Sequence, residues 1–170
     1  KLKMTGDGLD LERVENIHKN APNTKLVVDA NEGWTIDQYI DYASRFKELG
    51  VIMIEQPLPA GSDLQLASIP HPIPVCADES CHDTSTLPEL SGKYDMINIK
   101  LDKTGGLTEA LKLKRLALEQ GFQIMVGCMI GTSLAMAPGL VVGQGAAVVD
   151  LDGPLLLKDD RENGLEFKGS

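Results

Sequence analysis

Six charged side chains each stand at the end of a short apolar run and recur along the chain at regular intervals. They are Lys3, Asp29, Glu55, Asp78, Lys100 and Asp150. The first five lie 22 to 26 residues apart, and the last interval of 50 residues spans two such units. A period of this length accommodates one strand and one helix. Because the active site of a parallel barrel lies at the carboxyl ends of its strands, this spacing predicts that the six side chains meet there.

Three of these residues are carboxylates that follow three successive apolar runs, namely Asp29, Glu55 and Asp78. One oxygen ligand from each suits a hard divalent cation whose other positions are filled by water and substrate. Three negative charges against two positive ones leave the cation able to act as a Lewis acid. The pattern predicts a Mg²⁺ site, with Mn²⁺ as the alternative, although any one of these acids taken alone would be an ordinary solvated loop residue.

Two lysines, Lys3 and Lys100, flank the three carboxylates. Lysine is a weak base because its free pKa is about 10.4, and a nearby cation or burial lowers that pKa into a useful range. The metal would act on both lysines, and Lys1, on the same strand face as Lys3, would also act on Lys3. Two bases on opposite sides of a carbon, with a metal between them, indicate removal and return of a proton next to a carboxylate. The alternative is that Lys1 and Lys3 are surface lysines of a frayed terminus.

The elements that must position these residues are seven strands, most of them followed by a helix. We expect strands at residues 1–4, 26–29, 51–55, 75–78, 96–100, 123–126 and 146–150. We expect helices near residues 10–19, 62–68, 84–90 and 133–141. Thr35 and Gln38 have the spacing of a capping box that starts a helix, which Gly50 would end. Gly105 and Gly106 precede the longest predicted helix.

The strands are continuous runs of Val, Ile and Met, which is typical of a parallel sheet covered on both faces. An open doubly wound sheet shows similar runs, but its functional residues gather beside one switch point. A response-regulator-like module would have about five strands with its acids concentrated early. Here charged residues end nearly every strand, so we expect an α/β, TIM-like barrel. A complete barrel has eight strands and about 250 residues, so we expect a partial barrel without its first strand and with exposed, aggregation-prone edges.

Composition argues against several classes of partner. Sixteen Lys and Arg against 25 Asp and Glu give a net charge of −9 without a basic stripe, which argues against nucleic acid. No apolar run approaches the roughly 18 residues of a membrane span, so we expect no membrane partner. Cys76, Cys81 and Cys128 form no CxxC pair and favour a reducing compartment. Cys76 and Cys128 are interpreted as packed thiols.

Five motifs in chain order resemble the enolase superfamily, and more narrowly its muconate-lactonizing-enzyme subgroup. They are Lys1-Leu2-Lys3, Val28 to Asn31, Ile54 to Pro57, Cys76 to Ser80 and Asn98 to Gly106. The resemblance covers essentially the whole chain and implies a (β/α)7β barrel. It implies that residues 1–170 are one partial C-terminal barrel domain with strands two to eight, and that the N-terminal capping domain is missing.

The resemblance also implies roles for the charged residues. The three carboxylates would be the Mg²⁺ ligands, and Lys3 and Lys100 would be the acid/base pair. Asn31 and Glu79 would support the metal ligands without binding the metal themselves. Asn31 is explained equally well as a strand-end cap, and Glu79 as a surface acid.

The segment Asp150-Leu151-Asp152 discriminates among reactions of the subgroup. Two aspartates two apart on a strand point the same way and can bind a cationic group of a substrate, such as an ammonium. Dipeptide epimerases of the subgroup carry such a pair on the last strand, and Gly127-Cys128-Met129 is also similar to that group. The resemblance therefore implies a Mg²⁺-dependent isomerase that epimerises dipeptides of the L-Ala-D/L-Glu type by 1,1-proton transfer through a metal-stabilised enediolate. The substrate-binding residues would be Asp150, Asp152, Lys1, Cys128 and Met129.

Alternatives stay open at this point. Asp152 could begin a turn at Gly153 and Pro154, with Asp150 only ending a strand. N-acylamino-acid racemisation and o-succinylbenzoate synthesis occur in the same subgroup, but their substrates lack the free ammonium that Asp150 and Asp152 would bind. A non-catalytic metal-binding relative is the alternative of another class, and the intact ligand and lysine positions argue against it. The resemblance implies cell-wall peptide metabolism in a bacterial cytoplasm, with a small dipeptide as partner and a homo-oligomer left open.

Overall fold

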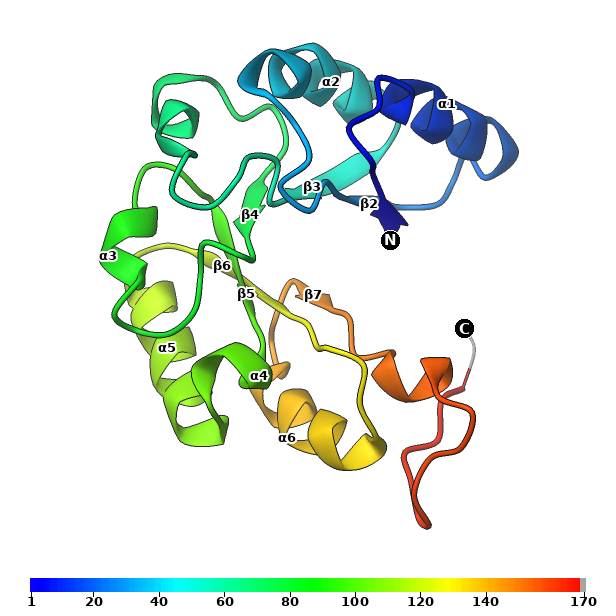
Figure 1. Ribbon diagram of the computed structural model, residues 1–170, viewed down its shortest axis with the longest axis vertical. Helices are drawn as coiled ribbons and strands as arrows, with labels where there is room; N and C mark the ends of the chain where they lie inside the picture. Colours follow the sequence, from blue (N-terminus) through cyan, green and yellow to red (C-terminus); the bar gives the residue numbers. More distant parts are fainter. Residues whose placement is uncertain (169–170) are drawn as a thin grey trace. The chain divides into compact units, whose positions relative to one another are not determined.

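A computed structural model describes residues 1–168 of the chain. Seven strands follow one another in the sheet in chain order (Figure 1). They are β1 (Leu2–Lys3), β2 (Leu26–Asp29), β3 (Val51–Glu55), β4 (Val75–Ala77), β5 (Met96–Ile99), β6 (Gln123–Val126) and β7 (Val148–Val149). The pairs β1–β2, β2–β3, β3–β4 and β6–β7 are parallel. Chain order in a parallel sheet is the strand order of a βα barrel, so the predicted α/β class is confirmed.

Helices separate most of the strands, as the sequence predicted. They are α1 (Asp10–Asn20), α2 (Ile36–Glu48), α3 (Leu87–Leu90), α4 (Leu101–Thr104), α5 (Leu107–Glu119) and α6 (Ser133–Val142), with 3-10 helices η1 (Leu64–Ser68) and η2 (Gly153–Leu156). The capping box of α2 is present, because Gln38 N–H donates to Thr35 Oγ1 at 3.3 Å and Thr35 N–H to Gln38 Oε1 at 2.9 Å. Among the helices of residues 1–168, none is long and apolar enough to cross a membrane.

Two predicted elements are much shorter than expected, and one short helix was not predicted. The helix expected at 84–90 is confined to α3, because Ser85 N–H donates to Asp83 Oδ1 at 2.8 Å in a local turn that competes with helix. The unpredicted α4 is a single turn that ends at Gly105, which takes a left-handed conformation with φ 74°. The strand expected at 146–150 is reduced to β7.

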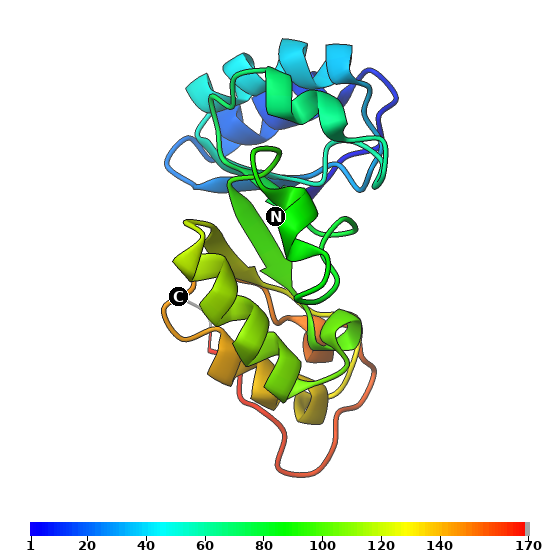
Figure 2. The same ribbon diagram turned by 90° about the vertical axis from the view of Figure 1, so that its left-hand side faces the viewer.

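The described residues form two compact units, and each has its own core. The first contains residues 1–81 and 88–96, and the second contains residues 82–87 and the chain from 97 onward. In the first unit α1 packs beside α2, and α2 packs on β3 (Figure 1). In the second unit α5 packs beside α6 (Figure 2). Fully buried side chains include Val14, Phe46 and Ile54 in the first unit and Leu113 and Val126 in the second, and each contributes about 1.5–3 kcal/mol through apolar burial.

Asp10, a buried carboxylate in the first turn of α1, ties the end of β1 to the end of β2. It accepts hydrogen bonds from the backbone N–H groups of Thr5 and Gly6, at 3.1 and 2.9 Å, and from Trp34 Nε1 at 2.8 Å. Burial opposes the charge on Asp10, but these donors and Arg13 hold its pKa below the usual range. The loop that follows Lys3 is therefore fixed to the loop that follows β2.

An ion pair between His71 and Asp95 lies at the amino-terminal side of β4 and β5. His71 Nδ1 is 2.8 Å from Asp95 Oδ2, and His71 Nε2 is 3.1 Å from the carbonyl oxygen of Leu66. Asp95 Oδ2 also accepts the N–H of Val75 at 2.9 Å. Because both ring nitrogens face acceptors, the protonated imidazole is favoured, and the hydrogen bond to Asp95 raises the pKa of His71.

This pair predicts how stability changes with pH. The pKa of His71 is raised on folding, so its contribution is fully present below the ordinary histidine pKa of about 6.5 and is lost as pH rises through the folded value. We expect the free energy of unfolding by urea to be larger near pH 6 than near pH 8.5, and we expect His71→Gln to reduce that difference. An identical pH dependence in the variant would contradict the assignment.

Candidate functional site

The carboxyl ends of β1, β2 and β3 bring three predicted site residues into one row in the first unit. Lys3 is in register with Asp29, and Asp29 is in register with Glu55. The side chains of Asp29 and Glu55 are fully buried. Because side chains in register on parallel strands point to the same face, the sheet itself places these charges next to one another.

The ammonium groups of Lys3 and Lys1 pair with the carboxylates of this row. Lys3 Nζ donates to Asp29 Oδ2 at 2.5 Å. Lys1 Nζ lies 3.1 Å from the same oxygen and 2.7 Å from Glu55 Oε2. Burial opposes the charge on Lys1, but the two carboxylates raise its pKa well above the ordinary value. In this arrangement Lys1 is a cation that bridges two acids.

The carboxylate of Glu55 is affected by burial and by the neighbouring acids. Burial raises the pKa of Glu55 to about 7, and the charges of Asp29 and Asp78 add to the rise while Lys1 opposes it. Asp78 follows β4, is 3% exposed, and is held by its N–H, which donates to Gln56 Oε1 at 2.9 Å. The third predicted carboxylate therefore lies close enough to act on Glu55 electrostatically.

The donor set suits a hard divalent cation in number, charge and chemistry. Within the described part of the chain, no three His, Cys, Asp or Glu side chains are arranged around a common point as metal ligands. Asp29 and Glu55 converge on the Lys1 ammonium instead. That ammonium stands where a cation shared by the two carboxylates would be needed, so a metal ion would have to displace it.

Asn31 contacts the carboxylate of Asp29, and Glu79 contacts Asn31. The N–H of Asn31 donates to Asp29 Oδ1 at 3.0 Å, and Asn31 Nδ2 donates to Glu79 Oε1 at 3.3 Å. Burial raises the pKa of Glu79, and the neighbouring charge of Asp78 adds to the rise. Asn31 therefore orients Asp29 while joining it to Glu79.

The second unit gathers the remaining candidate residues around Cys128. Burial raises the pKa of this thiol, the charges of Asp150 and Asp152 add to the rise, and that of Lys100 opposes it. Met129, the next residue, is 56% exposed. Three of the predicted residues therefore lie within electrostatic range of Cys128, which is half-buried.

The geometric argument for Asp150 and Asp152 requires correction. Neither lies in a strand, because β7 ends at Val149 and Asp152 directly precedes η2. The N–H of Asp150 donates to the carbonyl of Val126 at 2.9 Å and continues the ladder by one residue. The turn into η2, rather than strand alternation, brings the two aspartates near Cys128.

Sequence reasoning missed one residue of the first unit. Gln56 is fully buried and has a left-handed φ of 35°, which is costly for a residue with a side chain. Its only signal was its place in the motif Glu55-Gln56-Pro57.

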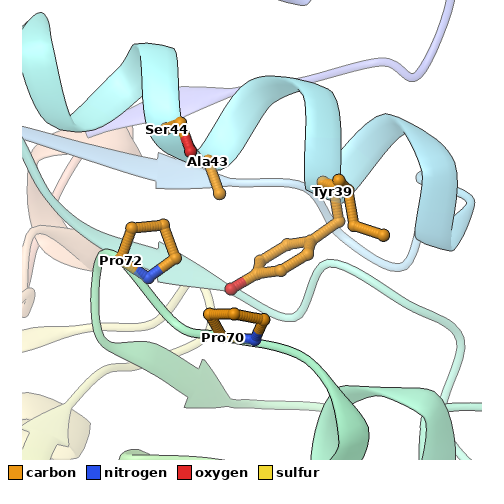
Figure 3. A pocket seen from close by; sticks show the side chains of 6 residues that line it. Tyr39, Ala43, Ser44, Pro70 and Pro72 are labelled. Carbon is orange, nitrogen blue, oxygen red and sulfur yellow. The ribbon is translucent and has the colours of Figure 1, made fainter.

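A hollow of about 150 Å³ lies elsewhere on the first unit (Figure 3). It is lined by Tyr39, Ile40, Ala43, Ser44, Pro70 and Pro72. Pro70 and Pro72 precede β4, so this hollow lies at the amino-terminal side of that strand and the carboxylates lie at the other. Tyr39 Oη is buried there and has no hydrogen-bond partner in the described chain. The hollow is separate from the candidate site.

Comparisons with known proteins agree on one family. Residues 1–161 match the family described as "Enolase C-terminal domain-like". Over 157 residues the chain is 51% identical to an N-acetyl-D-glutamate racemase of Pseudoalteromonas sp., covering 92% of the chain and 50% of the relative. Over 156 residues it is 49% identical to the L-Ala-D/L-Glu epimerase of Escherichia coli, covering 92% and 49%. The chain therefore spans about half the length of these curated relatives.

Solved structures have the same fold. An enolase family member from Agrobacterium tumefaciens with homology to dipeptide epimerases, solved with sodium and L-Ala-L-Glu, has a TM-score of 0.94 and 54% identity, covering 98% of this chain and 52% of that one. The dipeptide epimerase of Methylococcus capsulatus, complexed with Mg and L-Arg-D-Lys, has a TM-score of 0.88 and 31% identity, covering 94% and 48%. These similarities confirm the predicted barrel fold.

The adjacent carboxylates of Asp29 and Glu55 predict which substitutions weaken the binding of divalent ions. In the full-length protein we expect Asp29→Asn and Glu55→Gln each to weaken Mg²⁺ or Mn²⁺ binding by about 100-fold or more, because loss of a supporting partner alone costs about 10- to 100-fold. Isothermal titration calorimetry measures the dissociation constants. Glu48→Gln, which alters an exposed acid at the end of α2, is the control. Equal metal affinity in all three variants would contradict a metal site at this row.

Proposed function

Because this chain belongs to the enolase C-terminal domain-like family, we propose that it forms the partial barrel domain of a metal-dependent dipeptide epimerase. The observation that carries the proposal is the row of Lys3, Asp29 and Glu55 at neighbouring strand ends. A basic group beside buried acids is the arrangement needed to hold a cation and move a proton next to it. Relatives that are epimerases and racemases support the same class of reaction.

We assign the metal ion as Mg²⁺, with Asp29, Glu55 and Asp78 as its ligands. When bound, the ion would act as a Lewis acid towards a carboxylate of the substrate. The buried carboxylates of Asp29 and Glu55 support the assignment, because they are oxygen donors of the kind that a hard divalent cation prefers. The Mg complex of the Methylococcus capsulatus relative also supports it.

Lys3 and Lys100 are the proposed acid/base pair. One lysine removes the α-proton, and the other returns a proton to the opposite face of the same carbon. Lys3 now donates a hydrogen bond to Asp29. A cation bound at Asp29 would compete with this hydrogen bond.

The substrate is proposed to be L-Ala-D/L-Glu. An N-acetylglutamate and an alanylglutamate present the same acylated glutamate to the lysines, and only the dipeptide adds an ammonium group on the acyl side. The charges of Asp150 and Asp152 near Cys128 favour that ammonium. Racemisation of an N-acylated glutamate is the second candidate, because the relative from Pseudoalteromonas sp. is an N-acetyl-D-glutamate racemase.

We further propose that the enzyme acts on small dipeptides from cell-wall peptides in a bacterial cytoplasm. The name of the Escherichia coli relative, an L-Ala-D/L-Glu epimerase, supports the dipeptide substrate, and the cellular setting is an expectation from the resemblance of the motifs.

The test follows α-proton exchange by NMR, with the full-length protein, Mg²⁺ and L-Ala-L-Glu in D₂O. We expect exchange at the glutamate α-carbon with appearance of the D-epimer, and loss of both when a chelator is added. In Lys100→Ala we expect epimerisation to fall by at least about 10³-fold with unchanged Mg²⁺ affinity, since removal of a general base or acid costs 10²–10⁴-fold. Epimerisation at the parental rate in this variant would contradict the two-base mechanism.

The same assay separates the two substrates. With N-acetyl-L-glutamate in place of the dipeptide, we expect slower exchange. Asp152→Asn should slow the reaction of the dipeptide more than that of N-acetyl-L-glutamate, because only the dipeptide carries the ammonium. Faster exchange of N-acetyl-L-glutamate in the parent protein would move the assignment to the racemase.

A further inference from the structure

Gln56 joins the ends of three strands through its backbone and its side chain. Its N–H donates to the carbonyl of Cys76 in β4 at 2.9 Å, and its carbonyl accepts the N–H of Glu32, in the loop after β2, at 2.9 Å. Its side-chain oxygen Oε1 accepts the N–H groups of Asp78 and Ser80 at 2.9 and 3.1 Å. Gln56 therefore follows one proposed metal ligand directly and holds the backbone of another.

The surroundings fix which way the Gln56 amide points. The two N–H groups that face Oε1 can only donate, so that atom must be the oxygen. On the other side, Nε2 lies 2.9 Å from each of three oxygens, which belong to Leu58, Ser80 and Tyr94. A glutamate here would turn a carboxylate oxygen towards these acceptors, and an aliphatic residue would leave two backbone donors without their acceptor.

A buried ion pair anchors the donor side of this amide. Asp63 Oδ2 accepts hydrogen bonds from Ser80 Oγ at 2.7 Å and from Tyr94 Oη at 2.6 Å, and Asp63 Oδ1 accepts one from Lys93 Nζ at 2.6 Å. Asp63 is 2% exposed. Burial opposes its charge, but these donors, Lys93 first, hold its pKa below the usual range. Ser80 and Tyr94 donate their hydroxyl protons to Asp63. The lone pairs of the two hydroxyl oxygens can therefore accept hydrogen bonds from Gln56 Nε2.

We infer that Gln56 is a positioning residue that sets the separation of Glu55 and Asp78, with Asp63, Ser80, Tyr94 and Lys93 as its support. The inference rests on the proposed function, because it assigns the network a role in metal binding. The left-handed backbone of Gln56 turns the chain immediately after Glu55, and its side chain fixes the turn after β4 that carries Asp78. Loss of the amide would leave both carboxylates in place but free to move apart.

The experiment compares full-length parent protein with Gln56→Met and Tyr94→Phe. Met has a similar length and no hydrogen-bonding amide. Phe keeps the ring and removes the hydroxyl that joins Gln56 to Asp63. We expect Gln56→Met to weaken Mn²⁺ binding, measured by calorimetry without substrate, by about 10- to 100-fold. Tyr94→Phe should give a smaller loss in the same direction and keeps the test informative if Gln56→Met does not fold. Hydrogen exchange of the Asp78 and Ser80 amides, measured without metal, should become faster in Gln56→Met.

His71→Gln is the matched control, because it removes a partly exposed ion pair at the amino-terminal side of β4 in the same unit. It should lower the melting temperature and leave the Mn²⁺ dissociation constant unchanged. Parental Mn²⁺ affinity in both network variants, together with a lowered melting temperature, would show a purely structural role and overturn this inference alone. A folded parent protein that binds no divalent ion would overturn the proposed function together with the inference.

Discussion

The ion pairs of Asp29 and Glu55 with Lys1 are the interaction on which the rest of this structure depends. A buried charge without compensation costs several kcal/mol, and here two fully buried carboxylates lie side by side. The Lys1 ammonium bridges both, yet the pKa of Glu55 is still raised to about 7. Burial is the main cause of this rise, and the neighbouring charges of Asp29 and Asp78 add to it. A stable arrangement of this kind requires a rigid scaffold that keeps the acids together.

In the first unit, a stabilising ion pair lies at the amino-terminal side of the strands, and the candidate site residues lie at their carboxyl ends. At the amino-terminal side of β4, His71 pairs with Asp95, which also holds the first N–H of that strand. At the carboxyl side, the register of parallel strands sets the acids in a row, and the networks of Asp10 and Gln56 fix the loops that follow. This division is the one found in parallel βα barrels, where the carboxyl ends carry the active site.

Much of this organisation is predictable from the sequence because it depends on local pattern. Apolar runs gave the strands, and the capping box at Thr35 gave the start of α2. The helix predicted at 84–90 is shorter in the structure because a turn at Asp83 competes with it. Asp150 is outside the predicted strand because β7 ends at Val149. The roles of Gln56 and Lys1 depend on distant partners such as Asp78, 22 residues from Gln56, and Asp29, 28 residues from Lys1, and no periodicity encodes such contacts.

We propose that the three carboxylates hold a divalent ion in place of the Lys1 ammonium. A crystal structure of the full-length protein, grown with Mn²⁺ and recorded at a wavelength where manganese scatters anomalously, would test this proposal. We expect one anomalous peak about 2.1 Å from an oxygen of each of Asp29, Glu55 and Asp78, with Lys1 Nζ moved away from Asp29 and Glu55. An absence of anomalous density at these side chains, with Lys1 still bridging Asp29 and Glu55, would contradict it.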